Sequence, residues 1–438
     1  MAEMWDHDVE TTCIAEQIEN ASRLLTRHIE DVLRRSPFYR KKFSQEGISV
    51  SAIQGVEDLH KVPLSTKSEI KEAQDASPPF GPHLGIHQEK IRRVFQTSGS
   101  TGTPTLLAVT ARDLEIWRSI GARSYTAAGM SATSSVLLTF GAGPFVAGHI
   151  HALLDEMGPC VVPVSPGDTE RSLRVIELGI VDTYVGTPTF ALHLANSVSR
   201  RQNQPHALAL KHIITGGEPG GGLPEIRNQL EGTFSAQVRE IMGVGDISPS
   251  LFGECHEQDG MHFCGQGFVW PELIDANTSE PIEFEAGAYG ELVYTSLERE
   301  AMPLIRFRSG DLVHITDTRC KCGRTSFKMR CVGRSDDTFI VRGVNVFPSA
   351  IGDVTAEFRP FVTGRARAVI PRDTSVSIEP PIHVEVEVPD GSEQPENLAV
   401  SVESRIRSKL LFRAAVSFVP ESQFGDSSYK TRPVARSN

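Results

Sequence analysis

The sequence predicts an α/β protein, with a large N-terminal domain of mainly parallel sheets flanked by helices and a small α+β domain at the C-terminal end. From about residue 134, short apolar runs alternate with amphipathic segments, a rhythm typical of parallel strands covered by helices. Three of these runs end in glycine-rich or polar turns, where open α/β sheets bind their ligands. After residue 336 the alternation gives way to separate strand-like runs and one amphipathic helix.

Each element is expected from its own pattern of apolar residues. Helical spacing over 14–45 predicts that the chain begins with helix, and Pro37 follows the last residue of the stripe. In the large domain, strands are expected at 136–140, 160–164, 181–186, 212–217 and 238–243, and helices at 169–178, 190–201 and 224–231. In the small domain, strands are expected at 366–372, 382–388 and 415–421, and a helix at 396–411. A polar segment at 333–337 marks the boundary, which gives domains 1–335 and 336–438.

Composition excludes several classes of protein. The chain has 438 residues, of which 39% are hydrophobic, and its net charge of −11 argues against nucleic-acid binding, which requires a basic face. The N-terminal segment lacks the pattern of a secretory signal, and no stretch is suited to span a membrane. We therefore expect a cytoplasmic protein whose seven cysteines are core thiols or metal ligands, with a homodimer left open.

The most informative motif is QTSGSTGTPT at 96–105, where glycines and hydroxyl residues dominate. Glycine permits close backbone approach, so N–H groups and hydroxyls can surround phosphate oxygens. The pattern differs from the P-loop because no lysine follows Gly102. By composition alone, a flexible linker is an equal alternative. The turns at 186–189, 216–222 and 242–246 are expected to surround one cleft.

The order of residues in this motif resembles the phosphate loop of the adenylate-forming superfamily of acyl-CoA synthetases, adenylation domains and luciferases. Within it, the chain is similar nearly end to end to the phenylacetate–CoA ligase branch. Five further segments carry this resemblance: SPFYRKKF (36–43), DLHKVPLSTKSEI (58–70), GGEP (216–219), AMPLIRFRSGDL (301–312) and GRSDDTFIVRGVNVFPSAI (333–351). The resemblance implies that a carboxylate attacks the α-phosphate of ATP and releases pyrophosphate. A thiol, expected to be that of CoA, then takes the acyl group and releases AMP.

The resemblance also implies roles for single residues. The nucleotide-binding residues would be Thr97, Ser98, Gly99, Ser100, Thr101 and Gly102 at the phosphates, Gly217, Glu218, Pro219, Met242 and Gly243 near the adenine, and Asp311 at the ribose. Arg334 would face the nucleotide, and Asp336 would be the hinge of a mobile C-terminal domain. Lys430 would supply positive charge while pyrophosphate departs.

The turn after the strand at 238–243 departs from the family pattern. Met242 stands where an aromatic residue is common and therefore lacks a π face for the adenine. Gly245 replaces a hydroxyl residue, and Asp246 replaces a glutamate that would hold Mg²⁺, on a shorter arm. A specialised biosynthetic role is favoured over a catabolic one.

The acid would bind among aromatic and small residues, which suit a flat ring in a narrow slot, although core packing is an equal alternative. The candidates are Phe140, Phe145, Gly148, His149 and Thr187. A structural Zn²⁺ site is expected from two ligand pairs in the order seen in this branch. The ligands would be Cys255, His262, Cys320 and Cys322, with His256 and Cys264 as substitutes, while Cys13, Cys160 and Cys331 would be core thiols.

The leading hypothesis is therefore an AMP-forming ligase that joins an aryl or arylacetic acid to CoA, using ATP and Mg²⁺. A second hypothesis keeps the adenylation step but transfers the acyl group to an amine or a carrier-protein thiol. A third is a nucleotide-binding protein that has lost catalysis.

Overall fold

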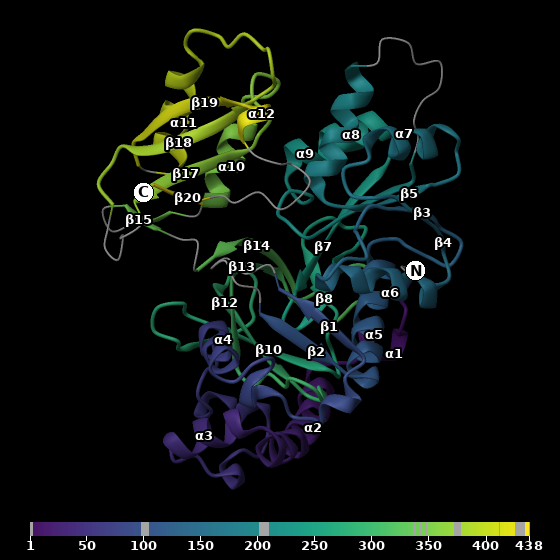
Figure 1. Ribbon diagram of the computed structural model, residues 1–438, viewed down its shortest axis with the longest axis vertical. Coiled ribbons are helices and arrows are strands. Elements are labelled where there is room, and N and C mark those ends of the chain that lie inside the picture. Colours follow the sequence, from purple (N-terminus) through teal and green to yellow (C-terminus); the bar gives the residue numbers. More distant parts are fainter. Residues whose placement is uncertain are drawn as a thin grey trace.

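The computed structural model describes residues 3–97, 105–200, 210–335, 339–341, 344–346, 348–371, 378–410, 412–424 and 434–437. Figure 1 shows N-terminal helices at one end of the molecule and two lobes at the other. One lobe carries α7, α8 and α9, and the other is formed by the C-terminal part of the chain. None of the helices within these ranges is long and apolar enough to cross a membrane.

The α-helices are α1 (His7–Glu10), α2 (Ile14–Arg35), α3 (Pro37–Gln45), α4 (Lys67–Ala76), α5 (Ala111–Ala127), α6 (Ile150–Met157), α7 (Thr169–Glu177), α8 (Pro188–Arg200), α9 (Pro224–Phe234), α10 (Pro348–Ala356), α11 (Leu398–Leu410) and α12 (Glu421–Phe424). The helix expected over 14–45 is two helices, because the Ser36 backbone is extended between them. Pro37 begins the second helix, a position where its missing N–H costs nothing.

The strands of the large sheet are β3 (Ser135–Leu138), β4 (Cys160–Pro163), β5 (Thr183–Gly186), β6 (His212–Thr215), β7 (Gln237–Val244), β8 (Ser248–Glu254), β9 (Met261–Phe263), β10 (Val269–Ile274), β11 (Pro281–Ile282), β12 (Tyr289–Ser296), β13 (Phe307–Asp317) and β14 (Lys328–Arg334). Their spatial order is β11-β10-β12-β13-β14-β9-β8-β7-β6-β5-β3-β4. The predicted α/β class is confirmed, and the five predicted strands are β3 to β7, which pair in parallel.

The other half of this sheet is antiparallel and is not among the elements expected from the sequence. Several of its strands, such as β8, β9 and β12, are buried almost continuously and so lack the alternation that identifies a half-buried strand. In β12, for example, every residue after Tyr289 is buried. Core packing on both faces therefore removed the signal on which the prediction depended.

Three smaller sheets lie outside the large sheet in the described residues. β1 (Arg93–Gln96) pairs with β2 (Leu106–Val109), so the strands flank the glycine-rich loop on both sides. The C-terminal part contains β15 (Phe339–Val341) paired with β16 (Val344–Val346), and a four-stranded sheet in the order β19-β18-β17-β20. The strands of the four-stranded sheet are β17 (Ala366–Pro371), β18 (Ile382–Val388), β19 (Ala414–Pro420) and β20 (Val434–Ser437).

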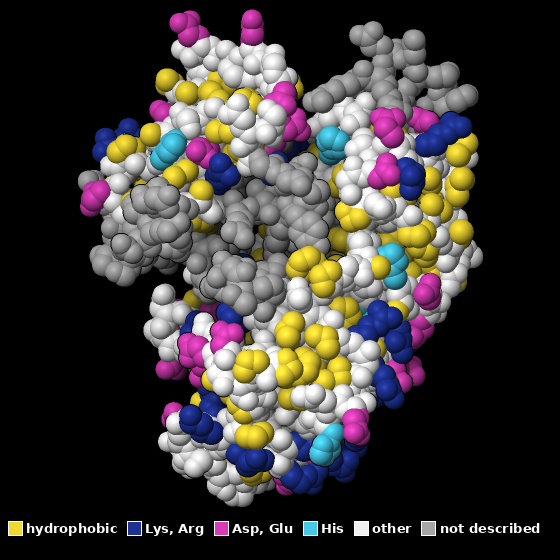
Figure 2. Space-filling view, viewed as in Figure 1, with side chains coloured by type: hydrophobic (Ala, Val, Ile, Leu, Met, Phe, Trp, Pro, Cys, Tyr) yellow, Lys and Arg dark blue, Asp and Glu magenta, His cyan; other side chains and the backbone are white. Residues whose placement is uncertain are grey.

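The C-terminal part has a hydrophobic core of its own, built from residues between Phe339 and Ala414. It touches the rest of the chain at α9, where the Arg359 guanidinium donates to Oε1 of Gln229 over 2.8 Å. On the face shown in Figure 2, basic and acidic side chains are interspersed.

Candidate active site

The ends of the parallel strands bring predicted acyl and nucleotide residues to one edge of the sheet. Phe140 follows β3, Thr187 follows β5, and Gly217 follows β6. A Cβ placed on Gly217 would lie 3.5 Å from Cε1 of Phe140 and 3.9 Å from Cγ2 of Thr187. Residues far apart in sequence therefore meet at the carboxyl ends of the strands, the expected place for a ligand site in such a sheet.

The turn that follows β6 is held by its own glutamate. Gly217 has a φ of +84°, which glycine adopts without steric strain. The Glu218 carboxylate accepts a hydrogen bond from the Thr189 N–H, with 3.0 Å between Oε1 and N. Thr189 lies in the first turn of α8, where the helix dipole favours a negative charge. The neighbouring Pro219 is exposed, so the turn presents its outer side to solvent.

Glu240 supports the same turn and is a residue that the sequence analysis did not identify. It lies on β7, and its carboxylate accepts hydrogen bonds from the N–H groups of Gly222 and Gly220. A Cβ on Gly222 would come within 2.6 Å of Oε2 of Glu240, so glycine is needed for this contact. Burial, with the nearby charge of Glu254, raises the pKa of Glu240 to about 7. An acidic residue inside the strand expected at 238–243 is the signal that could have identified it.

Asp246 lies in the turn between β7 and β8, at the same edge. Its Oδ2 lies 2.8 Å from Nζ of Lys67, the first residue of α4. The strand before Asp246, β7, approaches β8 closely, because a Cβ on Gly243 would lie 2.0 Å from the carbonyl oxygen of Pro249. Met242 is partly buried and packs against the large hydrophobic core of the antiparallel half. The contact with Lys67 was not expected, since 179 residues separate the two partners.

Asp311 and Arg334 are brought together by strand register. They face one another across β13 and β14, and Nη1 of Arg334 lies 2.9 Å from Oδ1 of Asp311. The Asp311 side chain is only 8% exposed, whereas that of Arg334 is 36% exposed. The Asp311 N–H donates to Oγ of Ser309 over 3.0 Å. The ribose-binding candidate is therefore held in place by the residue expected to face the nucleotide.

The remaining acyl candidates lie in the segment that precedes α6. Phe145 is half-buried and bridges to Gln96, beside the glycine-rich loop. Gly148 packs closely, because a Cβ there would lie 2.9 Å from the Gly143 carbonyl oxygen. His149 is buried against Trp117, with 5.6 Å between ring centroids. Burial lowers the pKa of His149 to about 4, so the ring is neutral at pH 7.

Several predicted residues lie outside the described ranges. These are the phosphate-loop residues Ser98, Gly99, Ser100, Thr101 and Gly102, the hinge residue Asp336 and the lysine Lys430. The loop's first residue, Thr97, is buried, and its N–H donates to the Thr105 carbonyl oxygen over 3.1 Å. The base of the glycine-rich loop is thus closed by a backbone hydrogen bond.

A separate cluster joins the four predicted zinc ligands. The ligand atoms of Cys255, His262, Cys320 and Cys322 all lie within 4.8 Å of one another. The Sγ atoms of Cys255 and Cys320 are 3.6 Å apart, and Sγ of Cys322 is 3.4 Å from Nε2 of His262. Nδ1 of His262 faces the Ser326 carbonyl oxygen at 3.3 Å, which leaves Nε2 for a metal ion.

The other cysteines and the alternative histidine lie outside this cluster. Cys264 is buried, and burial raises the pKa of its thiol to about 11. The His256 ring lies beside Glu257 instead, with 3.1 Å between Nε2 and Oε1. The expectation that Cys13 and Cys160 are core thiols is wrong, because both are exposed. Cys13 precedes the exposed first turn of α2, and Cys160 begins β4, which is an edge strand of the large sheet.

Comparisons with known proteins agree with this architecture. The chain is 34% identical to a phenylacetate–coenzyme A ligase of Thermus thermophilus over 369 residues, which cover 83% of this chain and 80% of that protein. It is 31% identical to a phenylacetate–coenzyme A ligase of Aromatoleum evansii over 377 residues, which cover 85% and 83% of the two chains. A search against protein-family models gave no match.

Among solved structures, the chain is similar to 2-hydroxyisobutyryl-CoA ligase in the postadenylation state, in complex with 2-HIB-AMP. The TM-score is 0.87 and the identity 27%, with 99% of this chain and 92% of that one covered. The identity to two phenylacetate–coenzyme A ligases and the architecture shared over almost the whole chain together show the family. The chain belongs to the phenylacetate–CoA ligase branch of the adenylate-forming superfamily and is an AMP-forming acid–thiol ligase.

Proposed function

We propose that this ligase activates an aryl or arylacetic acid with ATP and transfers the acyl group to CoA. The names of the relatives at 34% and 31% identity support an arylacetic acid. The observation that carries the choice is the Phe140 ring, which lies next to Gly217 at the edge of the sheet. A partly buried aromatic ring at this edge would offer a planar substrate ring a face to stack on.

A second candidate substrate is a small branched hydroxy acid. It is favoured by the similarity to 2-hydroxyisobutyryl-CoA ligase, whose structure overlaps this chain with a TM-score of 0.87. The size of the acyl pocket distinguishes the two candidate substrates, because a pocket that fits a phenyl ring makes few contacts with a four-carbon acid.

Exchange of labelled pyrophosphate into ATP, measured with a panel of acids, tests the proposal. The panel contains phenylacetate, benzoate, ring-substituted analogues of both, acetate and 2-hydroxyisobutyrate. We expect exchange with the aromatic acids and formation of a CoA thioester when CoA is added. Exchange with 2-hydroxyisobutyrate alone would select the second candidate. Products formed with amines but not with CoA would contradict the acceptor.

Replacing Phe140 with alanine tests the acyl pocket directly. We expect Phe140→Ala to raise KM for the aromatic acid about tenfold, since an aromatic contact and its buried area are lost. KM for ATP should stay within about twofold, because the nucleotide is held by other segments. Steady-state kinetics with each substrate varied in turn separate the two effects. Equal changes in both KM values would place Phe140 outside the acyl pocket.

The residues at the turn between β7 and β8 fit Mg²⁺. This ion is usually bound through one or two carboxylates together with substrate phosphates, and Asp246 offers such a carboxylate at the strand-end edge. When bound, Mg²⁺ would neutralise charge on the phosphates. Asp246 would orient it, and Lys67, 2.8 Å from the carboxylate, would add a fixed positive charge at the same place.

We expect Asp246→Asn to raise the Mg²⁺ concentration needed for half-maximal exchange about tenfold, because a neutral amide is a poorer ligand for a hard cation. The measurement is pyrophosphate exchange at fixed ATP over a range of Mg²⁺ concentrations. Asp259→Asn is the matched control, since this carboxylate lies in the turn at the other end of β8 and pairs with Lys328. Superimposable titrations of Asp246→Asn and the parent protein would remove Asp246 from the metal site.

We also propose the domain boundary, the hinge and the remaining nucleotide-binding residues that the family resemblance implies. The C-terminal part has its own hydrophobic core, which supports separate domains at 1–335 and 336–438 with the hinge at Asp336. Arg334, on the last described strand before this boundary, would face the nucleotide together with Asp311. The glycine-rich loop would hold the phosphates, and Lys430 would act during adenylation.

The Cys/His cluster is proposed to bind a structural Zn²⁺. A tetrahedral site with Zn–S bonds near 2.3 Å separates its ligand atoms by roughly 3.7 Å. The separations of 3.6 Å between Cys255 and Cys320 and 3.4 Å between Cys322 and His262 fit that geometry. Four protein ligands leave no open position, so this metal would stabilise the fold and take no part in the reaction.

A further inference from the structure

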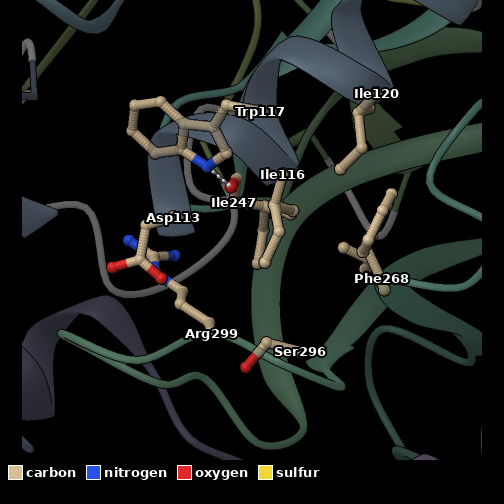
Figure 3. Close-up of a pocket in the computed structure, with 9 residues that line it drawn as sticks. Asp113, Ile116, Trp117, Ile120, Ile247, Phe268, Ser296 and Arg299 are labelled. Atoms are coloured by element: carbon tan, nitrogen blue, oxygen red, sulfur yellow. Dashed lines mark hydrogen bonds between the residues drawn. The ribbon is translucent and has the colours of Figure 1, made fainter. Parts of the chain in front are cut away.

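The turn that carries Asp246 is fixed by a set of buried side chains that the reaction itself does not require. Nη1 of Arg299 donates to the Asp246 carbonyl oxygen. One residue further on, the Ile247 carbonyl oxygen accepts a hydrogen bond from Nε1 of Trp117 over 2.6 Å. Two adjacent carbonyl groups of the same turn are therefore held by two separate donors. Figure 3 shows these side chains around a small cavity.

Helix α5 positions both donors, because it carries Trp117 itself and also carries Asp113, which binds the backbone after Arg299. Asp113 and Trp117 are four residues apart on this helix, so they lie on one face. The Asp113 carboxylate accepts from the N–H groups of Glu300 and Ala301 over 2.8 and 3.1 Å, which places the backbone that follows Arg299. It also accepts from the Thr110 N–H over 3.0 Å, at the helix start. Figure 3 shows Arg299 passing beside Asp113.

Burial of the Arg299 guanidinium in this position costs free energy of folding. Arg299 is 5% exposed, and its guanidinium lies over the Trp117 ring, 5.9 Å from the centroid. Within the described residues, its Nε and Nη2 atoms make no hydrogen bond. A buried cation with unsatisfied donors costs stability, and an apolar residue of similar volume is often as stable or more so. The position of Arg299 is therefore better explained by its hydrogen bond to the Asp246 turn than by a contribution to the stability of the fold.

We propose that Arg299 and Trp117 are positioning residues for the Asp246 carboxylate, which they hold in the orientation needed to bind the metal ion that accompanies ATP. This inference rests on the metal role proposed for Asp246. The carboxylate is then constrained from two sides: Lys67 contacts its side chain, and Arg299 holds its backbone. Charge also contributes, because the Arg299 guanidinium interacts electrostatically with the carboxylates of Asp113 and Asp246.

The test compares Arg299→Met with Trp117→Phe, which keeps an aromatic ring but removes the Nε1 donor together with part of the buried indole. Two quantities are measured: Mn²⁺ binding in the presence of a non-hydrolysable ATP analogue, followed by electron paramagnetic resonance, and the thermal unfolding midpoint. We expect Arg299→Met to weaken Mn²⁺ binding about tenfold or more, as loss of a group that orients a metal ligand does. Trp117→Phe should weaken it about fivefold, the effect of one neutral hydrogen bond.

Arg123→Met is the matched control, because Arg123 is equally buried on α5 but binds the Gln266 carbonyl oxygen, 2.7 Å away, and Asp6. It should shift the unfolding midpoint and leave Mn²⁺ affinity unchanged. KM for the acid should stay within about twofold in Arg299→Met, because the guanidinium holds the backbone of the Asp246 turn and not an acyl candidate.

Mn²⁺ affinity equal to that of the parent in Arg299→Met and Trp117→Phe, with a clear loss in Asp246→Asn, would overturn the positioning role and leave the metal role intact. No loss in Asp246→Asn would overturn both. If Arg299→Met does not fold, Trp117→Phe decides, since it keeps an aromatic ring in the core and removes the Nε1 donor, and its unfolding midpoint shows whether it is folded.

Discussion

Replacing Lys430 with alanine is expected to slow formation of the acyl-adenylate by about a thousandfold, the effect of removing a key charge from a polyanionic transition state. The first step brings a carboxylate to the triphosphate, so negative charge accumulates as pyrophosphate departs. In the second step a thiol attacks the acyl carbon and AMP leaves, with no pyrophosphate present. Transfer from a preformed adenylate to CoA should therefore stay within about threefold of the parent rate.

The two half-reactions are measured separately, by pyrophosphate exchange and by thioester formation from a chemically prepared adenylate. Lys409→Ala is the matched control: this lysine also lies in the C-terminal part, but it pairs with Glu357 on the surface. Its loss should leave both half-reactions unchanged. An equal loss of both half-reactions in Lys430→Ala would contradict the assignment.

Removing Cys320 is expected to lower zinc content and thermal stability together. The cluster links Cys255, after β8, to Cys322, after β13, so one metal ion would close a long loop across the antiparallel half. Binding free energy at such a site is also folding free energy. We expect Cys320→Ser to lose most of its zinc and to lower the unfolding midpoint by about 5–10 °C. Activity per folded molecule should change little.

Elemental analysis and thermal unfolding of the two proteins test this expectation. Cys264→Ser is the control for loss of a nearby buried thiol outside the cluster. It should reduce stability while zinc content is kept, because a hydroxyl is placed in an apolar core. Absence of zinc from the parent protein, or equal zinc in Cys320→Ser, would mean that the four residues are ordinary thiols and a histidine.

Sequence order was enough to predict the class of fold and which turns meet at one edge of the large sheet. The five parallel strands were found because apolar runs separated by amphipathic helices are a local pattern. The turns at Gly217 and Asp246 followed from that pattern, since parallel strands end at the same edge. The two cysteine pairs were joined through the order of motifs in a family, and the structure brings their ligand atoms within 4.8 Å.

The sequence alone therefore determined the α/β class, the family and the chemistry of AMP-forming ligation, because these depend on short motifs and local periodicity. The tertiary structure decided which side chains hold those motifs in place. Lys67 reaches Asp246 across 179 residues, and Arg299 reaches the same turn across 53. The antiparallel half and Glu240 were likewise found only in the folded chain. Long-range contacts leave no local pattern, since burial is set by whatever packs against a segment and not by its own sequence.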